Sequence, residues 1–377
     1  MKRLLILCLL AAAGLLTMSA QHDLKQNMKT IRSGEIWPDD AGQHVNAHGG
    51  GILKFDDTYY WYGEHKSDHT SSALVGVTCY ASKDLVNWRN CGVALSVVDE
   101  RGHDLERGCI LERPKVIYNK TTKKFCMWFH LELRGRGYDA ARYGVAVSNR
   151  PEGPFKFLYS QRADAATWPL EFGPQQLAVV DTLNENNFRE WWTPAWHQAV
   201  AEGLIVKRDF AAGQMSRDMT VFVDDDGKAY HIFSSEENLT LHIAELTNDY
   251  LHHTGRYTRL APAGHNEAPA IFKHDGIYWM ITSGCTGWEP NEARMFSAPT
   301  IFGPWTQHPN PCRGPKANKT FGGQSTFVLT LDDGRHIFMA DIWRPRHPSD
   351  ARYIWLPIDF EQGKPVIRWR NEWELAL

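Results

Sequence analysis

The chain has 377 residues, of which 43% are hydrophobic and 12% aromatic, and it contains 15 tryptophans. This is enough apolar material for one large domain or two of ordinary size. The formal net charge is −3 and no basic patch is present, which argues against nucleic acid as a partner. The tryptophans fit either a β-rich core or a carbohydrate-active protein, because sugar rings present apolar C–H faces that stack on indoles.

The N-terminus predicts a secretory signal peptide at residues 1–20. A charged start (Lys2-Arg3) precedes an almost wholly apolar run over 4–16, and small residues follow it. No later stretch is apolar for long enough to span a membrane. We therefore expect an exported protein, periplasmic or extracellular, whose mature chain is residues 21–377.

Six cysteines remain in the mature chain: Cys79, Cys91, Cys109, Cys126, Cys285 and Cys312. Export permits disulfides, but this scattered spacing is neither a disulfide framework nor a metal motif. We expect most of the six to be small buried side chains, with Cys79 and Cys91 the easiest pair to bridge.

Five segments share one pattern, in which a polar turn lies beside an aromatic, alternating strand. They are residues 55–66, 119–132, 224–237, 273–284 and 331–343. Their turns, such as Asp-Gly and Lys-Thr-Thr-Lys, predict β-hairpins. A further strand unit follows each hairpin, at 80–88, 146–155, 243–253, 295–305 and 357–369. Five such four-stranded modules predict an all-β fold, a five-bladed β-propeller, over a large β-sandwich.

One region, at about 160–215, breaks this period and reads as helical and loop-like. We expect Trp191, Trp192 and Trp196 on one helix there. The region is an insertion between the second and third blades, either a rim over a pocket or surface padding. The rest of the mature chain reads as a single propeller domain.

Three acidic residues occur in register: Glu112, Asp218 and Glu267 each stand just before the first strand of a hairpin. In a propeller the inner strands line a central channel, so these carboxylates should converge at its mouth. Paired carboxylates around a pocket suit glycoside hydrolysis, in which one acid protonates the leaving oxygen and needs a raised pKa.

At these residues the chain resembles glycoside hydrolase family 43, whose members are five-bladed propellers that hydrolyse glycosides with inversion. The resemblance covers nearly all of the mature chain. It implies that Glu267, in EAPAIFKHDGIYW, is the general acid. It also implies that Asp218, in SRDMTVFVDDDGKAY, orients that acid and tunes its pKa.

The family's third residue, a base Asp in the first blade, is missing, since Asn46, Ala47 and His48 stand in its place. The pattern AHGGG, WYGEHK, ERPKVIYN and FGGQSTF is similar to the branch with exo-β-1,3-galactanases that act on arabinogalactan. In that branch the base Asp is also absent. The resemblance implies that Gln324 positions or activates the water and that Glu112 holds the sugar near the site.

The same resemblance implies that Glu64, Tyr143 and Trp288 contact the terminal sugar. Two of them have a structural alternative, because Glu64 could pair with Lys66 or Arg113 and Tyr143 could be a core aromatic. The loop position of Trp288 favours exposure and stacking on a sugar. Glu236 ends a hairpin strand of the third blade and either reaches the channel or lies in a solvated turn.

His48 either places a water or ion in the channel or is structural. A central Ca²⁺ occurs in some members of the family, but no ligand set is visible in this sequence. We expect no required cofactor, and a Ca²⁺ ion in the central channel is possible but not predicted.

We therefore expect an exo-acting, inverting glycoside hydrolase that releases terminal galactose from arabinogalactan-type plant glycans. An α-L-arabinofuranosidase or a β-D-galactofuranosidase on the same fold is the alternative within enzymes. An inactive propeller that only binds glycan is the alternative outside them. The expected partner is an oligo- or polysaccharide, and the expected state is a monomer.

Overall fold

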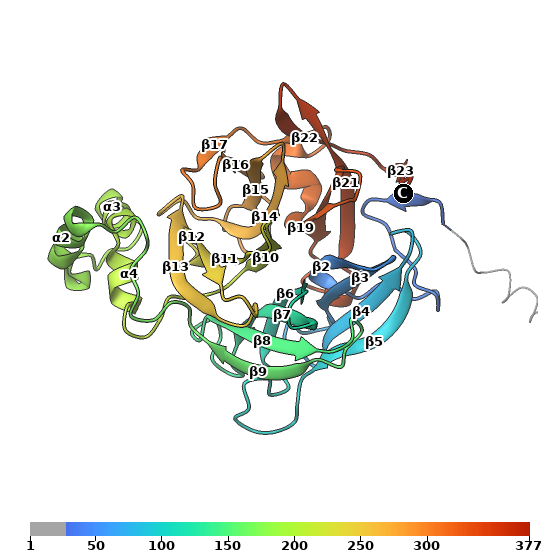
Figure 1. Cartoon of the computed structure of the whole chain (residues 1–377), viewed down its shortest axis with the longest axis horizontal. Coiled ribbons are helices and arrows are strands. Elements are labelled where there is room, and N and C mark those ends of the chain that lie inside the picture. The colour runs from blue at the N-terminus through green and yellow to red at the C-terminus, as the bar shows by residue number, and fades with distance from the viewer. Residues whose placement is uncertain (1–27) are drawn as a thin grey trace, which may run out of the picture.

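The structure, a computed structural model, describes residues 28–377, so the predicted signal peptide lies outside the described residues. Five sheets, antiparallel except for one short parallel pair at the outer edge of the fifth, stand like blades around a central axis (Figure 1). Each blade runs from an inner strand at the axis to an outer strand at the rim. The predicted five-bladed β-propeller is confirmed.

The first three blades contain four strands each, paired in chain order. Blade 1 comprises β2 (His48–Phe55), β3 (Thr58–Glu64), β4 (Gly76–Ser82) and β5 (Arg89–Ser96). Blade 2 comprises β6 (Ile110–Asn119), β7 (Lys124–Glu132), β8 (Arg142–Ser148) and β9 (Lys156–Gln161). Blade 3 comprises β10 (Met219–Val223), β11 (Ala229–Ser235), β12 (Thr240–Leu246) and β13 (His253–Leu260).

Blade 4 repeats this order, and blade 5 has an additional short strand at its outer edge. Blade 4 comprises β14 (Glu267–His274), β15 (Ile277–Ser283), β16 (Arg294–Ala298) and β17 (Thr306–His308). Blade 5 comprises β19 (Gln324–Thr330), β20 (His336–Ile342), β21 (Arg352–Glu361), β22 (Lys364–Arg368) and the edge strand β18 (Cys312–Arg313). Short 3-10 turns occupy Glu185–Asn187, Ala317–Gly322 and Pro348–Asp350.

The hairpins form where the turn chemistry predicts them. In blade 4, His274 pairs with Ile277, which leaves a two-residue turn of Asp275 and Gly276. Both residues have positive φ, 48° and 77°. This left-handed pair matches the twist of the flanking strands, and Asp-Gly adopts it readily.

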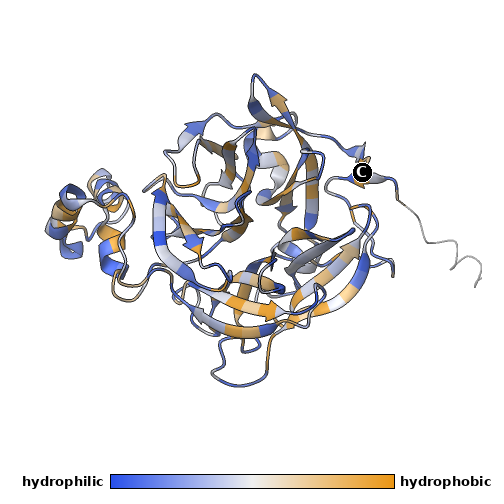
Figure 2. Cartoon of the chain, viewed as in Figure 1, coloured by the Kyte–Doolittle hydropathy of each residue, from blue (hydrophilic) through white to orange (hydrophobic). Residues whose placement is uncertain are grey.

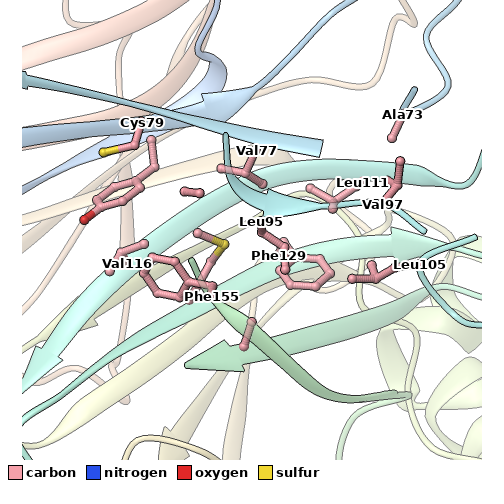
Figure 3. Packing of buried hydrophobic residues seen from close by; sticks show 14 of the residues in the cluster. Ala73, Val77, Cys79, Leu95, Val97, Leu105, Leu111, Val116, Phe129 and Phe155 are labelled. Atoms are coloured by element: carbon pink, nitrogen blue, oxygen red, sulfur yellow. The ribbon is translucent and has the colours of Figure 1, made fainter. Parts of the chain in front are cut away.

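The hydrophobic core is a ring of five clusters, each filling the space between two neighbouring blades. Figure 3 shows the cluster between blades 1 and 2, where Val77 and Cys79 face Val116 and Phe129. Figure 2 shows apolar and polar residues interspersed along the strands of every blade. Because each blade buries both of its faces against neighbours, most tryptophans serve this core.

The two ends of the described chain meet, which ties the first blade to the last. β1 (Thr30–Arg32) pairs antiparallel with β23 (Glu372–Glu374). Trp37, near the start, packs edge-on to Trp61 of blade 1 and Trp355 of blade 5. The circle of blades is thus closed by strand pairing and by a cluster of indoles.

The insertion lies between β9 and β10, between the second and third blades, as predicted. It folds as α2 (Pro174–Thr182), α3 (Pro194–Glu202) and α4 (Leu204–Asp209), which stand to one side of β13 (Figure 1). The expectation that Trp191 and Trp192 are helical is wrong. Helix α3 begins at Pro194, because Thr193 caps it by accepting a hydrogen bond from the Trp196 amide at 3.2 Å.

All six cysteines within residues 28–377 are free in the structure, so the Cys79–Cys91 bridge is not formed. Four of them are buried, as expected of small apolar side chains. Within 28–377, no helix has the length and apolar character needed to cross a membrane.

Candidate active site

The inner strands of four blades deliver the predicted catalytic side chains to one end of the channel. Glu267 and Gln324 are the first residues of β14 and β19, Asp218 directly precedes β10, and Glu112 lies near the start of β6. Hydrogen bonds join Asp218, Gln324 and Glu267 by way of Arg113, and an atom of Glu112 lies within 4.8 Å of one of Asp218. The convergence expected from their register is what the structure shows.

A backbone irregularity follows three of the inner-strand starts. The strand register shifts directly after His48, Glu112 and Glu267. The next residue in each case has a positive φ, at 61° for Gly49, 56° for Arg113 and 53° for Ala268. A bulge of this kind turns the preceding side chain away from the regular pleat. Left-handed Arg and Ala are uncommon, and such strain concentrates at functional sites.

Buried groups hold these bulges in place. The Arg113 amide donates to Glu64 Oε1 at 2.9 Å, and the Gly49 amide donates to Asp341 Oδ2 at 2.6 Å. The neighbouring Gly50 has no room for a side chain, since a Cβ there would lie 1.8 Å from the Tyr62 carbonyl oxygen. The close approach of the Tyr62 backbone thus explains why glycine occurs in the AHGGG segment.

Glu267 is largely buried and has the electrostatics of a general acid. Burial raises its pKa to about 7, with a further contribution from the negative charge of Asp218. The Asn238 side chain donates from Nδ2 to Glu267 Oε1 at 2.8 Å. A carboxyl group with a pKa near 7 carries a proton in a large part of the population at neutral pH, which is what proton donation requires.

Arg113 joins three members of the site. Its Nη2 donates to Asp218 Oδ2 at 2.8 Å and to Gln324 Oε1 at 2.6 Å. Its guanidinium also lies over the Trp343 ring, 5.4 Å from the centroid. One buried cation therefore fixes both the Asp218 carboxylate and the Gln324 side-chain amide.

Gln324 is fixed at both ends of its amide group. Its Oε1 accepts from Arg113 and from Trp343 Nε1, the latter at 2.8 Å. Its Nε2 donates to Ser283 Oγ at 2.9 Å and lies 3.4 Å from Glu267 Oε2. The plane of the amide is thereby set, so Gln324 is a preorganised polar group.

Glu112 belongs to a buried chain of charges. His130 bridges Glu112 (Nδ1 to Oε2, 3.1 Å) and Glu132 (Nε2 to Oε1, 3.0 Å). Burial by itself disfavours the carboxylate form of Glu112 and the protonated form of His130. The hydrogen bond from His130 nevertheless lowers the pKa of Glu112 to about 2, and the two carboxylates raise the pKa of His130 to about 9. Glu112 is therefore an anion and an acceptor at neutral pH, which fits holding a sugar hydroxyl but not donating a proton.

Glu112, His130 and Asp218 lie close enough for one atom of each to reach a common cation, within 4.8 Å of one another. The donor chemistry does not fit a metal. Both nitrogens of His130 are engaged with carboxylates, and its raised pKa means that the ring is protonated and has no free lone pair.

Of the predicted sugar-binding residues, Trp288 is placed at the site. It is 47% exposed and stands edge-on to Trp343, with ring centroids 6.0 Å apart. Glu64 also adjoins the site, but from beneath. It is buried, forms an ion pair with Lys66 and accepts from the Arg113 amide. Glu64 is therefore a structural partner of these two residues, which was the alternative to a sugar contact.

Three of the candidate ligand-binding residues are corrected, because their side chains are fully buried. Tyr143 packs between blades 2 and 3, with its ring stacked 4.9 Å from that of Trp128. His48 lies under the site, stacked on Tyr353 at 5.2 Å. Glu236 is enclosed by Arg259, which donates to it twice at 2.7 Å. None of the three presents a surface to a ligand.

Sequence reasoning missed two residues that do face the site. Tyr138 is 44% exposed and donates from its hydroxyl to Glu112 Oε1 at 3.0 Å. Negative charge on Glu112 raises the pKa of this tyrosine. Asn238 contacts the acid itself. Both lie on irregular loops between strands, where no periodic pattern marks them, and Tyr138 is only five residues from the tyrosine that was predicted instead.

Comparisons with known proteins agree with this geometry. The family model described as glycosyl hydrolases family 43 matches residues 189–351. A solved structure of a family 43 β-1,3-galactosidase, BT3683, with galactodeoxynojirimycin is 56% identical, with a TM-score of 0.90. The similarity covers 92% of this chain and 100% of that one. The chain belongs to glycosyl hydrolase family 43.

Two further family 43 structures are similar over 92% of this chain, each with a TM-score of 0.73. An exo-β-1,3-galactanase from Phanerochaete chrysosporium with β-1,3-galactotriose is 33% identical, with 68% of that chain covered. An exo-β-1,3-galactanase from Clostridium thermocellum is 34% identical, with 66% of that chain covered. A search of curated proteins found no match. Membership of family 43 makes this protein a glycosidase.

Proposed function

We propose that this protein is an exo-acting, inverting glycoside hydrolase that releases terminal galactose from β-1,3-linked galactan of arabinogalactan-type plant glycans. The observation that carries the proposal is the environment of Glu267. Burial and the charge of Asp218 raise its pKa to about 7, and the first-blade segment Asn46-Ala47-His48 holds no carboxylate. The similarity to a β-1,3-galactosidase and to exo-β-1,3-galactanases supports the sugar, the linkage and the exo mode.

In this proposal Glu267 gives its proton to the glycosidic oxygen as the bond to the anomeric carbon breaks. Asp218 stays fixed by Arg113 and raises the pKa of Glu267 without contacting the leaving oxygen. Glu112 accepts from a sugar hydroxyl, and Tyr138 lies next to it on the same wall. The charged and hydrogen-bonding groups are held in place before the sugar arrives, which lowers the cost of reorganisation.

We propose that Gln324 orients the water that attacks the anomeric carbon. The first-blade segment contains no acid, and its residues do not replace one. The Asn46 side chain donates to the Lys66 carbonyl oxygen and accepts from the Lys66 amide, and Ala47 is buried. An amide is not basic, and Gln324 Oε1 already accepts from Arg113 and Trp343. Its contribution is therefore the position of the water rather than a high proton affinity, and the proton that the attacking water loses as the new C–O bond forms passes to solvent water.

The test is hydrolysis of β-1,3-galactan and of p-nitrophenyl β-D-galactopyranoside, β-D-galactofuranoside and α-L-arabinofuranoside by the wild type and Glu267→Gln. We expect galactose from galactan and turnover of the galactopyranoside alone among the aryl substrates. Proton NMR of the first product should show the α-anomer, as inversion requires. Glu267→Gln should lose about 10³-fold in kcat on galactan and less on the aryl glycoside, whose leaving group needs little protonation.

The matched control is Asp275→Asn, an exposed carboxylate at the other end of the same hairpin. It should keep wild-type rates. Turnover of the arabinofuranoside alone would assign the enzyme to that sugar instead. Binding of galactan without turnover of any substrate would replace the enzyme with a glycan-binding propeller. Export of the mature chain and a monomeric state stay predictions from the sequence.

A further inference from the structure

The position of the acid defines one side of the site. A general acid protonates the leaving oxygen, so the departing part of the glycan must lie on the side of Glu267. On that side, Asn238 donates to Glu267, and the Cys285 thiol contacts the Asn238 carbonyl oxygen at 3.4 Å. The loop that carries Cys285 therefore borders the place where the leaving group emerges.

A hollow of about 530 Å³ opens next to this loop. Its wall includes His265, Cys285, Asn291, Glu292, Arg294 and Asn310. Arg294 is fixed there, because its Nη1 donates to the backbone carbonyl oxygens of Gly264 and His265 and to Asn266 Oδ1. The lining is dominated by hydrogen-bonding side chains, which suits a ligand rich in hydroxyl groups.

Two indoles of the insertion extend the wall of this hollow outward. Trp191 and Trp192 are 41% and 57% exposed. Trp192 stacks on His265, which lines the hollow, with ring centroids 5.0 Å apart and planes at 27°. Trp191 stacks on the buried Trp196 at 5.2 Å and 20°. We call Trp191, Trp192 and His265 the tryptophan platform.

This arrangement is unusual for surface tryptophans. The rings are held by stacking on other rings, yet a large part of each indole stays open to solvent. Exposed apolar surface next to a polar hollow marks a binding site more often than scattered exposed residues do. Flat indoles above hydrogen-bonding groups match the two surfaces of a sugar ring, its C–H face and its hydroxyls.

We propose that the hollow and the tryptophan platform bind the leaving-group side of a β-linked galactan chain, several sugar units beyond the scissile bond. The inference rests on the proposed function for the identity of the sugar. It assigns the insertion a role in recognising chain length. A protein partner fits less well, since two indoles offer far less than the roughly 800 Å² per partner of a stable interface.

The experiment compares Trp192→Ala and the double variant Trp191→Ala/Trp192→Ala with the wild type on substrates of increasing length. p-Nitrophenyl β-D-galactopyranoside places only an aryl group beyond the scissile bond, whereas β-1,3-galactan oligosaccharides of four to six units reach the platform. We expect kcat/KM on the long oligosaccharides to fall about tenfold, the effect of losing one stacked aromatic. On the aryl glycoside it should change less than twofold. Leu170→Ala, an exposed apolar residue of the same insertion, is the control and should match the wild type.

An equal fall on both substrates, or no fall on the long ones, overturns the inference. A second readout separates it from the proposed function. Titration of the same galactan oligosaccharides into Glu267→Gln, with and without Trp192→Ala, measures binding without turnover. If the wild type hydrolyses no galactoside, the proposed function fails. In that case the platform inference is judged by the titration alone. It fails if Trp192→Ala leaves the Kd for galactan oligosaccharides unchanged, or if no galactan binds.

Discussion

The side-chain amide of Gln324 lies 3.4 Å from the carboxyl group of Glu267, measured from Nε2 to Oε2. This is long for a hydrogen bond, whereas Arg113 and Trp343 hold the other end of the amide at 2.6 Å and 2.8 Å. An inverting enzyme keeps its acid and its water-activating group roughly 6.5–9.5 Å apart to leave room for water. We therefore expect the bound sugar to separate this weak contact, with Gln324 remaining anchored by Arg113 and Trp343.

The first prediction concerns Gln324. Gln324→Ala should lower kcat on β-1,3-galactan by at least about 10²-fold, since removing one preorganised polar group costs this much elsewhere. Its KM should change little. Gln324→Glu should raise the pKa of Glu267 further, because a second negative charge would then stand close to it. Steady-state kinetics at several pH values measure both effects. An Ala variant with wild-type kcat would remove Gln324 from the mechanism.

The pH dependence of activity should follow Glu267. The acid must be protonated, and its pKa is about 7, so kcat/KM should be high below pH 7 and fall as pH rises through it. Asp218→Asn removes the negative charge that raises this pKa. The falling limb should then move to lower pH by on the order of one unit. A limb that stays in place in Asp218→Asn would mean that another group controls it.

Tyr138 should matter for the sugar and Tyr143 should not. Tyr138→Phe removes the exposed hydroxyl beside Glu112, and kcat/KM should fall on the order of tenfold. Tyr143→Phe removes a hydroxyl that accepts from Gln161 Nε2 at 2.7 Å at the edge of the core. It should lower the free energy of unfolding by about 1 kcal/mol and leave kcat/KM within twofold. Kinetics and thermal unfolding of the two variants decide the assignment, and the reversed pattern would restore Tyr143 to the site.

The His130 ion pairs should contribute to stability over a defined pH range. The pKa of His130 is raised to about 9 in the folded protein, above the value near 6.5 expected when unfolded. Its contribution is therefore complete below about pH 6.5 and is lost as pH rises through 9. His130→Phe leaves Glu112 and Glu132 buried without their partner and should cost about 3–5 kcal/mol at pH 6.

Thermal unfolding at pH 6 and pH 9 tests this pH range. The difference in Tm between the wild type and His130→Phe should be largest at pH 6 and shrink toward pH 9. His347→Phe, at an exposed histidine, is the control and should show no such trend. A Tm difference that grows with pH would contradict the ion-pair account.

Much of the fold could be predicted because each blade is encoded locally. Turn residues such as Asp275-Gly276 and the alternating strands beside them mark every hairpin, and hairpins repeat five times. The start of each inner strand is then a known place on the channel. This explains why the site residues at these starts could be placed together without coordinates: Glu267, Asp218, Gln324 and Glu112. The motifs that resemble family 43 lie at the same strand starts.

The sequence by itself therefore determined the propeller, the number of blades, the place of the insertion and the convergence of Glu267 with its neighbours. Only the tertiary structure decided which other polar and aromatic side chains reach the ligand. Tyr143, His48 and Glu236 are buried by packing between blades, whereas Tyr138 and Asn238 reach the site from irregular loops. The stacking of Trp192 on His265 likewise joins residues 73 positions apart. The alternation of a strand and the chemistry of a turn are set by a few neighbouring residues. The burial of a side chain depends on the neighbouring blade, which the local sequence does not specify.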